Sequence, residues 1–305
     1  MKTRKLVLLI ADVVLLAVCI IQCAISAHDT TKYFELKDSP DTILIDTPEE
    51  KGITVVKEND KWFVGNDKFP ANEAIVDDFV TAMSSIRVLD KVGTTNEANL
   101  DRYELNETKR TVVKALKDGK VVRQIAIGKE ASSNSQSYIT VDEGKDIYLA
   151  TGNLNYIFDT ITSAIRSEIV MNLESSTITE VAITKADGNT WSLSRMGNGD
   201  DIAWNVSGAE IEVDNLKAAS WFSTLASLNT RNWYEEKDVP AGGEKILTAK
   251  ITHAFQTTTI DIYAIPKVEG VPQAYYAFCS DMPYKFAMDS NVYDTYNKNP
   301  EDLAK

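Results

Sequence analysis

Trp62-Phe63-Val64, followed by Asn72 and by Phe79, Met83 and Ile86 at helical spacing, is the stretch that decides this fold, because the chain contains it twice. The second copy is Trp204-Asn205-Val206, Asp214, Trp221, Leu225 and Leu228. Each matched pair is 142 positions apart, so the register holds without a gap for about 25 residues. Each copy predicts a short aromatic strand, a capping residue and an amphipathic helix. We therefore expect an internal duplication.

The same order of elements is predicted around both copies. In the first copy, strands are expected at residues 42–45, 53–56, 62–64, 112–116, 121–127, 138–141 and 147–150, with helices after Asn72 and over 153–169. In the second, strands are expected at 181–183, 191–193, 204–206, 249–255, 259–264, 275–278 and 284–288. The last two match the first copy at an offset of 137, and a closing helix from Asn291 is expected to be cut short. This order predicts two α+β modules, each an antiparallel sheet with helices packed on one face.

The composition fits two folded modules. The chain has 305 residues, 44% of them apolar, and a net charge of −13. That charge argues against nucleic acid, whose phosphates need a basic face. The sequence predicts a cytoplasmic stub (1–5), a transmembrane anchor (6–27), a polar spacer (28–40), module 1 (41–173) and module 2 (174–305).

The anchor follows from the N-terminal composition. Residues 6–27 contain no Lys or Arg and span roughly 33 Å as a helix, enough for a hydrocarbon core. Basic residues precede this run and acidic residues follow it, which predicts a cytoplasmic N-terminus and an extracytoplasmic body. A cleaved signal peptide is the alternative, with Ile25-Ser26-Ala27 as its cleavage site.

One stripe of the predicted anchor helix is polar or small. Asp12, Cys19, Cys23 and Ser26 fall within about 40° of a line along it. Such stripes mediate helix contacts in lipid, so these four residues are the candidate interface with another membrane protein. The alternative is that Asp12 is protonated or reaches the headgroups.

The sequence offers no catalytic, cofactor or metal site. Its two histidines, His28 and His253, lack partners at metal-ligand spacing, and His253 is expected to be a packing residue on a strand. Nucleotide-binding and nucleophile-elbow glycine motifs are absent. Gly197–Asp201 is expected to be a long hairpin loop, and Cys279 a buried thiol.

The aromatic residues suggest a second interpretation. Exposed rings could stack on sugars, and the candidates are Trp191, Trp204, Trp221, Trp233, Tyr275 and Tyr276. The equivalent places of Trp62 and Trp204 favour a core role instead.

The order of motifs resembles the bacterial domain of unknown function 4340. The motifs that carry the resemblance are Trp62–Val64, Asn72, Leu100–Leu105 (Leu-Asp-x-Tyr-x-Leu), Ile127-Gly128, Tyr138–Val141 and Ile147–Leu149. This chain has Glu104 where the family tends to have glycine. The second copy lacks a clear equivalent of that turn and has Pro240-Ala241-Gly242-Gly243 in the region.

The resemblance implies a membrane-anchored companion of ABC-type or gliding-motility-like transport systems. We therefore expect a non-enzymatic accessory subunit with an integral membrane partner such as an ABC permease. A polysaccharide-binding module is the alternative, and an anchored hydrolase is a third interpretation.

Overall fold

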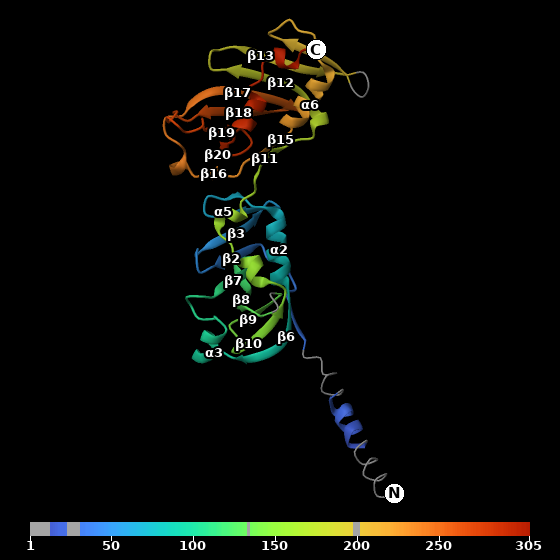
Figure 1. Ribbon diagram of the computed structural model, residues 1–305, viewed down its shortest axis with the longest axis vertical. Coiled ribbons are helices and arrows are strands. Elements are labelled where there is room, and N and C mark those ends of the chain that lie inside the picture. The colour runs from blue at the N-terminus through green and yellow to red at the C-terminus, as the bar shows by residue number, and fades with distance from the viewer. Residues whose placement is uncertain (1–12, 23–30, 133–134, 198–201) are drawn as a thin grey trace. The chain divides into compact units, whose positions relative to one another are not determined.

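The computed structural model describes residues 13–22, 31–132, 135–197 and 202–305 (Figure 1). The chain divides into two compact units, Met1–Arg166 and Ser167–Lys305, which we call unit 1 and unit 2. Both are α+β, with a large antiparallel sheet and short helices. The fold class predicted from the sequence is confirmed at this level.

Unit 1 is built on a ten-stranded sheet. Its strands are β1 (Lys32–Glu35), β2 (Thr42–Asp46), β3 (Ile53–Glu58), β4 (Lys61–Val64), β5 (Phe69–Pro70), β6 (Ser85–Thr94), β7 (Thr111–Lys117), β8 (Lys120–Glu130), β9 (Gln136–Val141) and β10 (Asp146–Thr151). Their order is β1-β6-β10-β9-β8-β7-β2-β3-β4-β5. The helices are α2 (Glu73–Ser84), α3 (Glu97–Arg102), α4 (Leu154–Phe158) and α5 (Thr162–Ile165).

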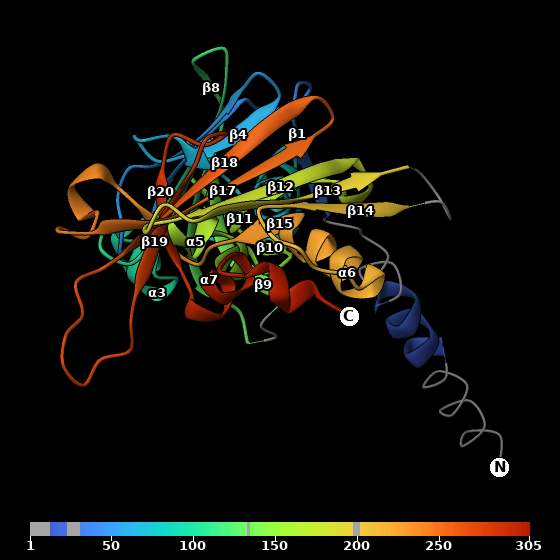
Figure 2. The ribbon, with the colours of Figure 1, turned by 90° about the horizontal axis from the view of Figure 1, so that it is seen from above.

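Unit 2 is built on an eight-stranded sheet and a two-stranded ladder. The strands of the sheet are β12 (Ile178–Lys185), β13 (Thr190–Met196), β14 (Ala203–Ser207), β16 (Trp233–Tyr234), β17 (Glu244–His253), β18 (Gln256–Ala264), β19 (Tyr275–Cys279) and β20 (Lys285–Met288). Strands β11 (Ile169–Asn172) and β15 (Ser227–Asn229) form the ladder. The helices are α6 (Asn215–Leu225), α7 (Ser290–Tyr296) and the 3-10 turns η1 (Ser175–Thr177), η3 (Glu236–Asp238) and η4 (Pro300–Leu303). Figure 2 shows α6 and α7 on the same side of the sheet.

The two units share an order of strands. Eight strands of unit 1 follow the order β6-β10-β9-β8-β7-β2-β3-β4, and those of unit 2 follow β16-β20-β19-β18-β17-β12-β13-β14. The register repeats as well, since Val55 pairs with Ile43 and Val64, and Leu193 pairs with Val181 and Val206. The two sheets therefore repeat one pattern of strand order, and of pairing register in these three strands.

The two predicted helix caps are present. Asn72 accepts a hydrogen bond from the Ala74 amide at 3.1 Å, and Asp214 accepts one from the Leu216 amide at 2.8 Å. These bonds satisfy amide groups that a helix start leaves unpaired. The helices end sooner than expected, because the chain is already extended at Ser85. Ile86 lies on β6, where alternation along a strand rather than a helical turn turns its side chain inward.

The segment expected to be a spacer contains a strand. β1 pairs with β6, where Phe34 lies opposite Ile86, and β11 pairs with β15, where Met171 lies opposite Leu228. Each repeat therefore begins with a four-residue strand that the sequence did not predict. β1 lies in a mostly polar segment, and the apolar β11 follows directly on residues that were expected to be helical. β11 belongs to unit 2, although the sequence placed residues 169–173 in module 1.

The predicted offset of 137 for the last two strands is wrong by one residue. Ile139 on β9 lies opposite Ile127, and Ala277 on β19 lies opposite Ile262, with all four side chains buried. The matching offset is therefore 138, which places Tyr276 where the first repeat has Tyr138. A slip of one residue exchanges the two faces of a strand, and the buried positions of β9 and β19 show that 138 is the correct offset.

The closing helix expected over residues 153–169 is two short helices, α4 and α5. Unit 2 closes in the same way, with α7 and η4. In both units the chain returns to the start of the long helix, because the Asn72 amide donates to the Ile165 carbonyl and the Asp214 amide to the Leu303 carbonyl, each at 2.8 Å. The expectation of a shortened closing element in the second copy is therefore wrong.

One core position differs between the repeats in a way that affects stability. Phe158 stacks on Phe79 in unit 1, with ring centroids 5.2 Å apart. At an offset of 138, unit 2 has Tyr296, which is 1% exposed. Among the residues that the structure describes, none gives the buried Tyr296 hydroxyl a hydrogen bond.

We predict that Tyr296→Phe stabilises the protein by about 1 kcal/mol at neutral pH, because an unpaired buried hydroxyl is removed. Burial raises the pKa of Tyr296 above its ordinary value of 10. The unfolded chain therefore ionises first as the pH rises past 10, and the wild type loses stability there. Urea denaturation at pH 7 and pH 10.5 should show a larger advantage for the variant at the higher pH. A variant less stable than the wild type at both values would contradict this.

Candidate functional site

The residues predicted to form a membrane interface lie at the N-terminus. Asp12, Cys23 and Ser26 fall outside the described residues, while Cys19 lies in the helical segment 13–22 and is exposed. Apolar side chains of this segment are between 45% and 64% exposed, namely Val13, Val14, Leu15, Leu16, Val18, Ile20 and Ile21. Within the described ranges, no helix has the length and apolar character needed to cross a bilayer.

The turn Leu100–Leu105 covers a second face of the sheet in unit 1. Tyr103 and Leu105 form a buried cluster with Ala126 and Ile147. Ala126 alternates on β8 with the buried Ile125 and Ile127, whose side chains face the opposite side. The expectation of helices on one face is therefore wrong for α3 and its turn, because a second small core forms on the other face.

Gly128 is where this turn meets the sheet. The Tyr103 carbonyl accepts a hydrogen bond from the Lys129 amide at 2.9 Å, and a Cβ at position 128 would lie 2.1 Å from that carbonyl oxygen. The Gly128 carbonyl in turn accepts a hydrogen bond from Asn155 Nδ2 of α4 at 2.6 Å. The Ile-Gly motif therefore permits a backbone contact that joins α3, β8 and α4.

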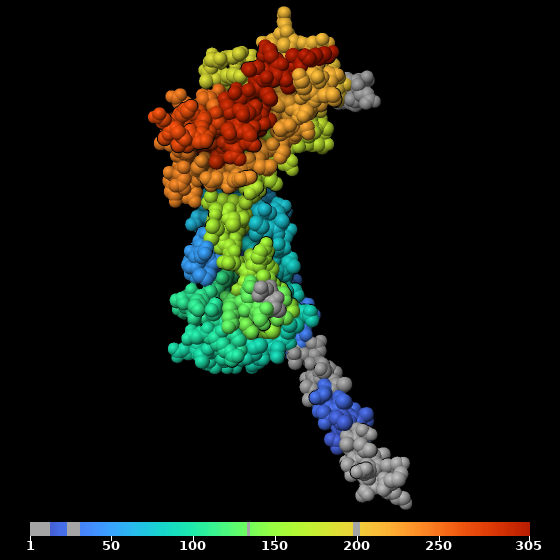
Figure 3. Space-filling model, viewed as in Figure 1, coloured from blue at the N-terminus to red at the C-terminus, as the bar shows by residue number. Residues whose placement is uncertain are grey.

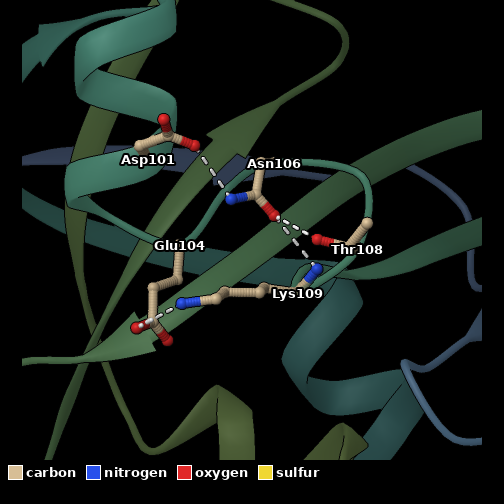
Figure 4. Close-up of polar contacts among 5 residues, drawn as sticks. All are labelled: Asp101, Glu104, Asn106, Thr108 and Lys109. Carbon is tan, nitrogen blue, oxygen red and sulfur yellow. Dashed lines mark hydrogen bonds and ion pairs between the residues drawn. The ribbon is translucent and has the colours of Figure 1, made fainter.

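The backbone conformation of Glu104 shows why glycine suits the position after Tyr103. Its φ is +56°, in the left-handed region that residues with a Cβ rarely adopt. Figure 4 shows the polar contacts that surround it: Lys109 Nζ lies 3.2 Å from Glu104 Oε1, and Asn106 donates to Asp101 at 3.0 Å while accepting from Thr108 at 3.0 Å. The turn therefore keeps its geometry without the glycine.

We predict that Glu104→Gly stabilises unit 1 by about 0.5–1 kcal/mol, because relief of the left-handed strain exceeds the value of one exposed ion pair. Thermal denaturation of the full-length protein would measure the change. Lys109→Ala is the matched control, since it removes the same ion pair and keeps the strain. If Glu104→Gly lowered stability as much as Lys109→Ala does, relief of the strain at position 104 would contribute nothing and the prediction would be wrong.

A groove of about 660 Å³ lies in unit 2 between α6, α7 and η4. In Figure 3 the C-terminal segment, dark red, lies directly against the amber residues of α6. The lining combines the apolar side chains of Trp221, Leu216 and Leu303 with charges of both signs. Of these charges, Lys217 is already hydrogen-bonded to the Ala304 carbonyl at 2.7 Å. The lining therefore indicates no particular ligand chemistry.

The proposed sugar-stacking rings are largely core residues. Trp191, Trp221, Trp233 and Tyr276 are at most 5% exposed, so the prediction of exposed platforms is wrong for these four. Their faces pack on other rings, as Trp191 stacks on Trp221 at 5.4 Å. All four rings lie in unit 2, where partners far apart in the sequence hold them: Trp191 Nε1 donates to the Lys298 carbonyl and Trp221 Nε1 to the Thr295 carbonyl. Local patterns of aromatic residues do not reveal such contacts.

The buried polar and thiol groups of unit 2 are packing residues. His253 Nε2 lies 3.0 Å from Thr258 Oγ1, and that hydroxyl donates to Asp281 at 2.6 Å, as expected for a satisfied histidine. Cys279 is buried, which raises the pKa of its thiol to about 11. In the part of the chain that the structure describes, no cluster of His, Cys, Asp and Glu could hold a metal ion. His28 lies outside that part.

Comparison with known protein families shows to which family the chain belongs. A family described as Domain of unknown function (DUF4340) matches residues 62–245, more than half of the chain. The chain belongs to the DUF4340 family. In this DUF4340 protein the match begins on the Trp62 strand, includes the Leu100–Leu105 turn with Gly128, and ends at the start of β17. Neither the curated proteins nor the solved structures contain a significant match.

Proposed function

We propose that this DUF4340 protein is a non-enzymatic, membrane-anchored accessory subunit of an ABC-type or gliding-like transport complex, with both units outside the cytoplasm. The observation that carries the proposal is the exposed apolar surface of the N-terminal helical segment. Residues 13–22 are helical and expose apolar side chains along their length, within an apolar run that has a basic stub before it. Such a run favours lipid over water.

A buried arginine holds the first strand after the proposed anchor in the sheet of unit 1. Arg123 on β8 donates to the Phe34 carbonyl of β1 at 2.9 Å and to the Met83 carbonyl of α2 at 3.3 Å. Its Nε lies 3.3 Å from Asp142 Oδ2. β1 is the first strand after residues 6–27, so these bonds fix the segment that leaves the proposed anchor to the sheet.

The family resemblance is our reason for proposing a transporter as the partner. The polar stripe of the predicted anchor helix is our reason for placing the contact with that partner in the membrane. A carboxylate such as Asp12 within lipid is expensive and usually has a partner on a neighbouring helix. We therefore assign Asp12, Cys19, Cys23 and Ser26 to the contact with an integral membrane subunit such as an ABC permease.

A pull-down from native membranes tests this function. The full-length protein is extracted in mild detergent, and the proteins that accompany it are identified by mass spectrometry. We expect permease or ATPase subunits of a transporter to co-purify with the wild type and to be lost with Asp12→Leu. Val14→Leu is the control, because position 14 lies on the opposite side of a helix with 100° per residue.

The outcomes separate the two parts of the proposal. Recovery of the protein alone would contradict the accessory-subunit function. Retention of the same transporter subunits by Asp12→Leu would keep that function but place the contact elsewhere than the stripe. Loss with both variants would indicate that the anchor as a whole, rather than its polar side, determines the contact.

A further inference from the structure

The turn between β17 and β18 carries a fully exposed phenylalanine. Ala254 and Phe255 are the two central residues of this hairpin, between the paired His253 and Gln256. The relative exposure of Phe255 is 108%, so its ring projects into solvent from the end of the sheet. Single exposed apolar residues are common on protein surfaces, and this one is distinguished by its backbone.

Both central residues have left-handed backbone conformations. The φ angles are +41° at Ala254 and +66° at Phe255. A two-residue hairpin of type I′ has positive φ at both central positions, which Asn, Asp and Gly adopt with least strain. For a bulky residue this conformation is a genuine outlier. The fold therefore tolerates a strained turn at this position.

The corresponding turn of the first repeat shows which residues suit this backbone conformation. The corresponding hairpin between β7 and β8 has Asp118-Gly119, with φ of +50° and +74°, between the paired Lys117 and Lys120. Asn59-Asp60 forms another positive-φ pair, between the paired Glu58 and Lys61. The same turn is thus made without strain elsewhere in the chain. Folding gives no reason for phenylalanine at position 255.

The surface beside Phe255 is polar but largely uncharged. The hydroxyls of Thr252 and Thr257 lie 3.3 Å apart next to the tip, and the Thr177 carbonyl accepts the Ala254 amide at 3.3 Å. The carboxylate of Asp281, at the same end of the sheet, accepts the Thr258 and Ser280 hydroxyls. An aromatic residue inside a polar rim with few charges is typical of the centre of a protein interface.

The charge distribution disfavours a lipid surface as the occupant. Segments that bind anionic lipid are rich in Lys and Arg, whereas this tip is formed by His253, Ala254, Phe255 and Gln256 in a chain of net charge −13. We propose that Phe255 is an anchor through which unit 2 docks onto another folded protein, one that offers an apolar pocket with an uncharged polar rim. The hairpin holds the ring in one position, which lowers the ordering cost of binding.

Photo-crosslinking tests the contact in native membranes. The full-length protein carries benzoylphenylalanine at position 255, with position 118 of the other repeat as the control. We expect one discrete protein adduct from position 255 that is absent from position 118. An adduct with lipid, an adduct with a second copy of this chain, or equal labelling from both positions would overturn the proposal.

Exchanging the residues of the Ala254-Phe255 and Asp118-Gly119 turns tests whether the strained turn is needed for binding. The adduct protein is purified and titrated against the wild type and the double variant Ala254→Asp, Phe255→Gly. We expect the variant to bind at least about 30-fold more weakly while its melting temperature rises by about 3–6 °C. The reciprocal variant Asp118→Ala, Gly119→Phe should melt lower and bind unchanged. Undiminished binding by the first variant would overturn the proposal. The Phe255 contact is tested in unit 2 and the Asp12 contact in the anchor. A negative result for one proposal therefore leaves the other unaffected.

Discussion

Replacement of Gly128 by alanine is expected to destabilise unit 1 by about 3 kcal/mol or more, because the added methyl group has no space. It would lie 2.1 Å from the Tyr103 carbonyl oxygen and 3.0 Å from Leu105 Cγ. Relief requires the Leu100–Leu105 turn to move, which breaks the Lys129–Tyr103 backbone hydrogen bond and opens the small core of Tyr103, Leu105, Ala126 and Ile147. Urea denaturation of the full-length protein measures the loss.

Gly119→Ala is the matched control for this substitution. Position 119 lies in the hairpin that precedes the same strand, and a Cβ there meets nothing within 4 Å. Its φ of +74° leaves only backbone strain, which amounts to about 1–2 kcal/mol. If the two variants were equally unstable, the close contact with Tyr103 would not be the cause at Gly128.

Replacement of Arg123 by methionine is expected to destabilise unit 1 by about 3 kcal/mol, because it leaves buried carbonyl groups without donors. The Arg123 side chain is 5% exposed. Its guanidinium donates hydrogen bonds to the carbonyls of Phe34, Glu35 and Met83. Methionine has a similar length and no donor. β1 should then detach from β6, since Phe34 and Glu35 belong to that strand.

Limited trypsin digestion locates this effect. Cleavage after Lys32, the first residue of β1, and after Lys37, two residues beyond its end, should become faster in Arg123→Met before the rest of unit 1 is cut. Arg102→Met is the control, because Arg102 is exposed and the same change there removes no buried donor. Loss of stability without faster cleavage at these two lysines would show that Arg123 supports the core rather than β1.

The amino-acid sequence by itself determined the two repeats and their helix starts. The matched apolar spacing from Trp62 to Ile86 and from Trp204 to Leu228 depends only on local periodicity, and Asn72 and Asp214 cap their helices through contacts two residues away. Local rules of this kind act wherever the sequence occurs. The order of motifs also identified the family, and the predicted anchor stays a prediction that the pull-down tests.

Other features were decided by contacts between residues far apart in the chain. β1 becomes a strand because β6 and the guanidinium of Arg123, 89 residues from Phe34, satisfy its backbone. Glycine at position 128 is required because the Tyr103 carbonyl, 25 residues away, packs against it. Four of the rings proposed as sugar platforms are buried because each sheet is covered by elements that sequence spacing does not place. Long-range packing, which no local pattern encodes, therefore determined where each repeat begins, which glycine has no room for a side chain and which of the proposed rings are buried.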